Sequence, residues 1–180
     1  MSERTANLLA AAGQLVADAV TTRLADELTH TASAPAALMT IAHHPGLSID
    51  RLSEALGITE SGGVRLIDRL AADGLVRREK LSARSLRLHL TGRGGRAVER
   101  IEQARIAAAA EIMAPLSAAQ RRQLEALLAR ILAARTHGEA DLRRICRLCS
   151  FDACERDGQT CPVSAAAQSD QTATRRPPSR

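Results

Sequence analysis

The chain has 180 residues, a formal net charge of +5 and a pI near 9.8. It contains one Phe and no Tyr or Trp, so its core has to be built from Leu, Ile, Val and Ala, which suits packed helices. No apolar run reaches the roughly 18 residues of a membrane span, and no cleavable targeting pattern is present, so a cytoplasmic location is expected. The positive charge favours a polyanionic partner. No Ser/His/Asp set, paired carboxylates or phosphate loop is found, so we do not expect an enzyme.

The first part of the chain predicts two helices. Apolar residues at helical spacing indicate a long helix from about Thr5 to Leu28, and its apolar stripe has to be covered by the same chain or by a second copy. A second helix begins at Ser33, whose hydroxyl we expect to cap it, with Pro in its first turn. That helix ends at His43 and His44. We expect these two side chains to face solvent, because a His pair in a turn has no third or fourth metal ligand nearby.

Residues 47–91 predict a helix, a tight turn, a second helix and two strands joined by a basic loop. Ser48 caps the first helix, Gly57 ends it, and Thr59 caps the second helix. The residues after the second helix alternate with period two, as in half-buried strands. This order is that of a helix-turn-helix with a wing, a module that places one helix in a DNA major groove. The expected fold class is therefore mainly α with a small β-wing.

The second helix and the wing carry the residues expected to contact DNA. Their charge is concentrated, because Val76 to Arg100 hold eight Lys or Arg and two Glu, a local charge of +6. An exposed charge run is otherwise a solvated face, but here it directly follows a helix-turn-helix. We expect Arg65 and Ser61 to discriminate bases, the wing to neutralise phosphates, and Arg84 to enter a minor groove. The full expected contact set is Ser48, Thr59, Glu60, Ser61, Gly62, Arg65, Arg69, Arg77, Arg78, Lys80, Arg84 and Arg87.

Gly62 and Gly63 are unusual inside a helix, where each costs about 1 kcal/mol relative to Ala. They would either let the backbone approach DNA or allow tight packing against the preceding helix. We favour the approach to DNA for Gly62 and leave both explanations open for Gly63.

The stretch from Ser33 to Ala134 resembles the MarR family of bacterial winged-helix repressors. The resemblance rests on ALMTIAHHPGLSIDRLSEALGIT, VRLIDRLAADGLVRR, SARSLRLHLTGRG and APLSAAQRRQLEALLARIL. It implies a homodimer that binds pseudo-palindromic operators in double-stranded DNA, with recognition helices in major grooves and wings in flanking minor grooves. The family's wing usually carries Asp two residues before its Arg, whereas this chain has Ser82 before Arg84. The family also implies a small-molecule effector, but this chain lacks the aromatic residues to line such a pocket.

Helices on both sides of the winged unit are expected to form the dimer. A long helix from Gly92 to Ala114 is followed by another that begins with a capping box at Ser117 and Gln120. These helices are too apolar and too elongated for one small winged domain, so we expect a two-fold dimer, with a single-chain bundle as the alternative. The expected organisation is an N-terminal dimerisation helix (1–32), the winged domain (33–91), C-terminal dimerisation helices (92–137), a four-cysteine segment (138–163) and a disordered basic tail (164–180).

Four cysteines follow within sixteen residues: Cys146, Cys149, Cys154 and Cys161, with the spacing C-x2-C-x4-C-x6-C. Four thiolates can close around a tetrahedral Zn²⁺, which we favour. An iron–sulfur cluster also takes four cysteines and a closing Cys-Pro, and metal-free thiols that form disulfides on oxidation are a third explanation. We expect this segment to tune DNA binding. The alternative function is a protein–protein adaptor with a structural metal-binding tail, but an adaptor has no reason to concentrate Arg on the wing.

Overall fold

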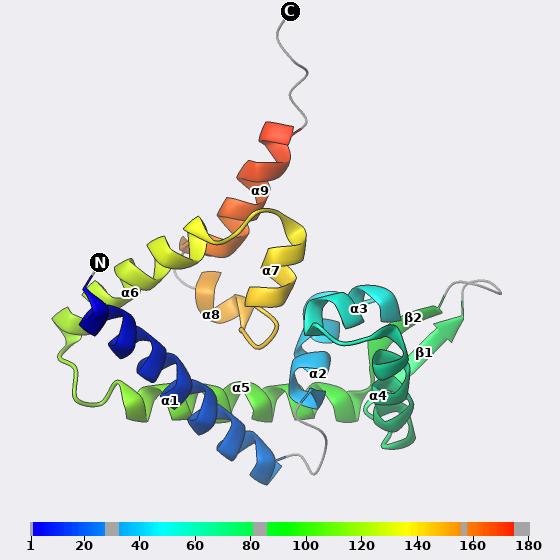
Figure 1. Ribbon diagram of the computed structural model, residues 1–180. Coiled ribbons are helices and arrows are strands. Elements are labelled where there is room, and N and C mark those ends of the chain that lie inside the picture. The colour runs from blue at the N-terminus through cyan, green and yellow to red at the C-terminus, as the bar shows by residue number, and fades with distance from the viewer. Residues whose placement is uncertain (1, 28–32, 81–85, 156–157, 175–180) are drawn as a thin grey trace, which may run out of the picture.

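The computed structural model of the protein describes residues 2–27, 33–80, 86–155 and 158–174. The described part is mainly helical with one two-stranded antiparallel sheet, which confirms the expected fold class. Its elements (Figure 1) are α1 (Glu3–Glu27), α2 (Ala34–His43), α3 (Ile49–Leu56), α4 (Glu60–Ala72), β1 (Val76–Lys80), β2 (Leu86–Leu90), α5 (Gly92–Ile112), α6 (Ala118–Ala134), α7 (Glu139–Ile145), α8 (Phe151–Glu155) and α9 (Pro162–Thr174).

The winged-helix unit consists of α2, α3, α4 and the β1–β2 hairpin, and its helix ends follow the local sequence signals. The Ser48 hydroxyl accepts a hydrogen bond from the backbone N–H of Arg51 at 3.4 Å, and Gly57 ends α3 in the left-handed region at φ +65°. Ser33 stands at the N-cap of α2, but its hydroxyl accepts no bond from that helix, so its expected capping role is wrong. The unit closes over one aliphatic core, whose fully buried members include Leu38, Met39, Ile41, Leu52, Ile67, Leu70 and Leu88.

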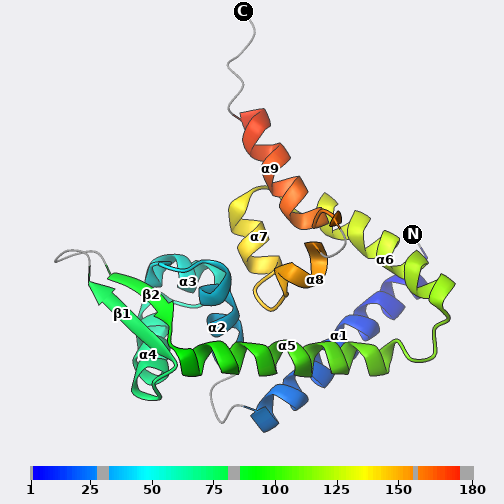
Figure 2. The same cartoon turned by 180° about the vertical axis from the view of Figure 1, so that it is seen from behind.

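Three longer helices frame this unit. α5 leads away from the wing. α1 packs across α5 and forms an ion pair with it, between Arg23 and Glu111. Both views show α6 turning back from the far end of α5 (Figures 1 and 2). The capping box of α6 is confirmed, with Ser117 and Gln120 exchanging hydrogen bonds. No residue of α6 is buried, although the helix carries five large apolar side chains, four of them exposed. No helix in the described ranges has the length and apolar character needed to cross a membrane.

Helices α7 and α9 and the cysteines beside them form a second, much smaller core. Its buried residues are Leu142, Cys146, Cys161, Val163 and Ala167. α9 packs against both α6 and α7, so the disordered tail expected from residue 164 is wrong as far as Thr174. The physical reason is that Val163 and Ala167 are covered by the cysteine segment, which periodicity within the short tail did not indicate. Residues 175–180 lie outside the described part.

Candidate nucleic-acid interface and cysteine centre

The recognition helix α4 has a buried side and a polar side. Gly63, Leu66, Ile67 and Leu70 face the core. The expected contact residues on the opposite side are all solvent-exposed: Glu60, Ser61, Arg65 and Arg69. Thr59 accepts a hydrogen bond from the backbone N–H of Gly62 at 3.1 Å and so caps the helix as expected. The structure therefore presents one helix N-terminus with polar and basic side chains, a surface that suits phosphate and base contacts.

The two glycines of α4 have different roles. A Cβ on Gly63 would lie 2.1 Å from the Ser53 hydroxyl oxygen, so this residue lets α4 pack closely on α3. Gly62 is half-buried, and a Cβ there would meet the Thr59 hydroxyl oxygen at 3.1 Å, beside the N-cap rather than the core. Of the two explanations for Gly63, the structure supports packing. The Ser53 hydroxyl it faces is buried and has no hydrogen-bond partner within the described ranges.

We expect Gly63→Ala to lower the free energy of unfolding by about 1–3 kcal/mol, the usual cost of overpacking. The cause is the added Cβ against Ser53, so the loss should shrink in a Ser53→Ala background, where the clashing oxygen is absent. Urea unfolding of the four proteins of this cycle measures the coupling. An equal loss in both backgrounds would contradict the packing explanation.

The strand register divides the charged residues of the wing between two faces. Arg77 pairs with His89 and Glu79 with Arg87, so these four side chains share one face. On it, Glu79 lies 2.8 Å from His89 Nε2 and 3.8 Å from Arg77, and Arg87 donates to the carbonyl oxygen of Gly46 at 3.3 Å. Two cations, Arg77 and Arg87, therefore flank the carboxylate of Glu79, which was not among the expected DNA-contact residues.

The other face of the wing looks toward the recognition helix. Arg78 forms an ion pair with Asp68 of α4, and Lys80 is exposed further along the strand. The guanidinium of Arg78 thus ties the wing to α4 as well as adding positive charge beside it. Arg84, the expected minor-groove residue, and Ser82 lie outside the described residues.

The four cysteines come from four different places in the C-terminal segment. Cys146 follows α7, Cys149 lies in the next turn, Cys154 is in α8 and Cys161 immediately precedes α9. All four are free thiols. Cys146 hydrogen-bonds Cys149, and Cys154 hydrogen-bonds Cys161. The fold therefore gathers the thiols in two neighbouring pairs.

These thiols alter one another's ionisation. The hydrogen bond from Cys146 lowers the pKa of Cys149 to about 6, helped by the nearby guanidinium groups of Arg105 and Arg147. The same pair raises the pKa of Cys146, because its proton is held in that bond and the site is buried. Burial and the neighbouring Cys161 raise the pKa of Cys154. These shifts favour ionisation of one thiol, Cys149, over the others. Ionisation of further thiols requires a positive charge among the four sulfurs to offset their repulsion.

The side chains as placed do not already form a metal site. Among the residues that the structure describes, no three His, Cys, Asp or Glu side chains are arranged to hold a metal ion. Metal binding by the four cysteines accordingly stays a prediction. Arg105 of α5 was not anticipated, because nothing local in the sequence connects it with Cys149.

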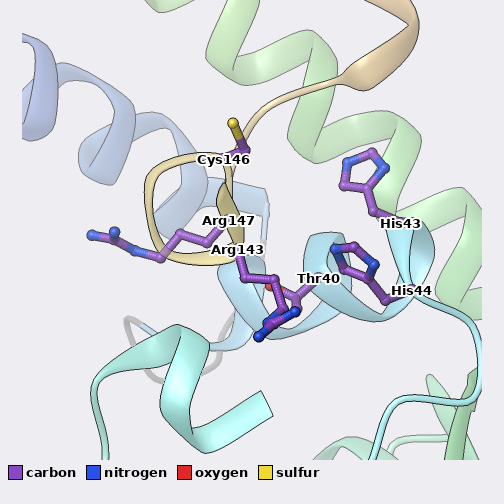
Figure 3. Close-up of a pocket in the computed structure, with 6 residues that line it drawn as sticks. All are labelled: Thr40, His43, His44, Arg143, Cys146 and Arg147. Atoms are coloured by element: carbon purple, nitrogen blue, oxygen red, sulfur yellow. The ribbon is translucent and has the colours of Figure 1, made fainter. Parts of the chain in front are cut away.

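The two histidines at the end of α2 are half-buried against the cysteine segment, so their expected exposure to solvent is wrong. His43 Nε2 lies 2.7 Å from the carbonyl oxygen of Cys149. Thr40, His43 and His44 of α2 line a small hollow with Arg143, Cys146 and Arg147 on its other side (Figure 3). Burial, followed by the charge of Arg143, lowers the pKa of His44. The correction has a simple cause: His43 and Cys149 are 106 positions apart and meet only in the fold.

Comparison with known proteins finds relatives of the winged-helix unit. A MarR family model matches residues 28–85, from before α2 to the wing. A putative transcriptional regulatory protein for the hcr operon of Thauera aromatica is 34% identical over 108 residues, which are 59% of this chain and 65% of that protein. Over residues 28–85 the winged-helix unit is therefore similar to the MarR family. The chain spans slightly less than two thirds of the length of this curated relative.

Solved MarR-family structures share the fold beyond the matched domain. A Mycobacterium tuberculosis MarR family protein in complex with salicylic acid has a TM-score of 0.57 and 29% identity, covering 69% of this chain and 93% of its own. The same protein in complex with DNA has a TM-score of 0.60 and 25% identity, covering 70% and 95%. The curated relative is a putative transcriptional regulatory protein, which agrees with the expectation that this chain is not an enzyme.

Proposed function

We propose that this protein is a homodimeric, sequence-specific DNA-binding transcriptional regulator of the MarR family that acts as a repressor. The main support for DNA binding is the exposed polar and basic side of α4, with Ser61, Arg65 and Arg69, next to a basic wing. The exposed Arg77 and Lys80 suit salt-dependent phosphate contacts, while side chains of α4 suit base edges. The similarity to the MarR family and the DNA-bound relative support this function.

The dimer follows from helices that the single chain leaves uncovered. Apart from Val64 of α4, the large exposed apolar residues in the described part lie on α1, α5 and α6: Leu8, Leu9, Leu15, Val16, Ile106, Leu127, Leu128, Ile131 and Leu132. Apolar stripes of this size mark surfaces that another protein covers. A second copy would cover them and would place two recognition helices for two half-sites about one helical turn apart.

The test is selection of binding sites from a pool of randomised DNA duplexes. We expect wild-type protein to enrich an inverted repeat, and Arg65→Ala to weaken binding of that duplex by about 1–3 kcal/mol while binding to unselected duplex barely changes. Arg77→Ala is the matched variant: it should weaken both duplexes alike and lower the salt dependence. Equal loss on both duplexes for Arg65→Ala would remove its base-reading role. If no duplex is enriched, the protein–protein adaptor becomes the better explanation.

We further propose that Cys146, Cys149, Cys154 and Cys161 bind Zn²⁺ and that this centre tunes DNA binding. The core around them has five buried residues, two of which are cysteines, and cores this small usually need a metal or a cross-link. A divalent cation would supply the positive charge that additional thiolates require, and Arg105 and Arg147 would offset the remaining negative charge. A signal at this centre also fits a chain with a single aromatic residue, although a relative binds salicylic acid.

Metal analysis of anaerobically purified protein separates the three chemistries. One zinc per colourless chain supports our proposal. Brown protein with iron and sulfide would replace zinc by an iron–sulfur cluster. Metal-free protein whose thiols form disulfides on oxidation would leave a thiol switch.

A further inference from the structure

The turn after α7 lies between the DNA-reading unit and the long helix α5. We call residues 146–150 the cysteine wedge. Its Leu148 side chain packs against the main hydrophobic core, which α1, α5 and the winged-helix unit share. The charge of Arg105 on α5 lowers the pKa of the Cys149 thiol, and Ser150 is buried. One short turn therefore contacts both the main hydrophobic core and, through His43, helix α2.

The contact with α2 is a directional hydrogen bond. The Cys149 carbonyl oxygen can only accept, so His43 has to donate, and its Nε2 atom carries the hydrogen at 2.7 Å. The residue that makes this bond through its backbone is also a proposed metal ligand through its sulfur. A change in what the sulfur binds is thus transmitted to α2 through one residue.

A second attachment joins α7 to the helix-turn-helix. The Arg143 side chain is only 10% exposed. It lies 2.9 Å from Glu139 of its own helix and 4.0 Å from Glu54 of α3. α7 and α3 also pack against each other, and α7 lies beside α3 in Figure 1. The cysteine segment consequently holds α2 and α3 together, the two helices that support recognition helix α4.

We propose that the cysteine wedge is the coupling element of this regulator: metal binding to the four cysteines fixes α2 through the His43–Cys149 contact and α3 through the Arg143–Glu54 contact of α7. This inference rests on the proposed zinc centre and DNA-binding function. Docking of the wedge fixes the conformation of the winged-helix unit before DNA binds. The metal-loaded dimer therefore holds its two recognition helices at the half-site spacing and binds DNA more tightly. Loss of metal frees the wedge and weakens binding.

The test compares zinc-loaded and zinc-stripped full-length protein for binding of the duplex selected by the wild type. We expect loading to tighten wild-type binding by about 5-fold to 150-fold, the usual range of coupling between two sites. His43→Ala should still bind one zinc, but its DNA affinities with and without zinc should be equal, a ratio near one. Both affinities should match that of zinc-stripped wild type. His43→Gln keeps an N–H donor and should retain most of the ratio. Arg144→Ala, an exposed α7 residue whose partner is Asp141, should behave like wild type.

Hydrogen exchange of α2 gives a readout independent of DNA. Zinc should protect α2 amides in wild type and His43→Gln, but not in His43→Ala. If wild-type protein binds zinc without any change in α2 exchange or DNA affinity, the wedge is overturned and the zinc centre stands. An undiminished ratio and undiminished α2 protection in folded His43→Ala also overturn it. Protein that binds no zinc overturns the centre and the wedge together, and zinc content identifies that case.

Discussion

Replacing Cys146 and Cys161 together by Ser should remove bound zinc and melt α7, α8 and α9 while leaving the winged-helix unit folded. Both side chains belong to a core of five buried residues, so little else holds these helices together. Structural zinc contributes apparent binding energies on the order of 10–16 kcal/mol, far more than this small apolar core can supply. Zinc content, together with limited proteolysis across residues 139–174, measures both effects.

A Val pair at the same two positions separates a metal role from a packing role. Buried cysteines that bind nothing behave as small hydrophobic residues, and Val would replace them at little cost. Ligands cannot be replaced in this way, so the Val pair should lose zinc and order as fully as the Ser pair. A Val pair with intact α7–α9 and unchanged stability would contradict the zinc centre.

Leu128→Glu combined with Ile131→Glu should convert the protein to a monomer and lower its affinity for the selected duplex by about 100-fold to 10,000-fold. The loss follows because a dimer binds its second half-site at high effective concentration. The two side chains are 42% and 46% exposed in the single chain, so the change should leave the fold of each chain intact. Analytical ultracentrifugation gives the mass, and thermal unfolding checks the fold.

Ala126→Glu is the control, since it adds one Glu to an exposed position on the opposite side of α6. It should remain a dimer with wild-type DNA affinity. If the paired Glu variant also stays dimeric, the interface lies elsewhere. A monomeric wild-type chain would instead support the single-chain bundle.

Local sequence signals were sufficient for most of the winged-helix unit and for the exposed side of α4. Caps and left-handed glycines act within a few residues, so Ser48, Gly57, Thr59 and Ser117 end or begin helices where their types indicate. The period of two in the wing and the helical period of α4 likewise depend on neighbours along the chain. The MarR-family resemblance and the mainly-α class with a small wing followed from these signals.

The polar partners of the wing were not available to such reasoning. The sequence placed Arg77, Arg78, Lys80 and Arg87 in one basic group, whereas strand register puts them on two faces. The ion pair of Arg78 with Asp68 depends on how the wing folds back on α4. Gly63 is similar, because its packing role becomes visible only when Ser53 of α3 lies beside it.

The sequence by itself determined that this chain carries a helix-turn-helix with a basic wing and four closely spaced cysteines. Only the tertiary structure decided that the cysteine segment docks on α2 through His43. It also decided that residues 164–174 continue as helix, because Val163 and Ala167 are buried there. The physical reason is the same in each case. Caps and periodicity are short-range properties of the chain, whereas these contacts join residues that are distant in sequence and acquire their chemistry only from one another.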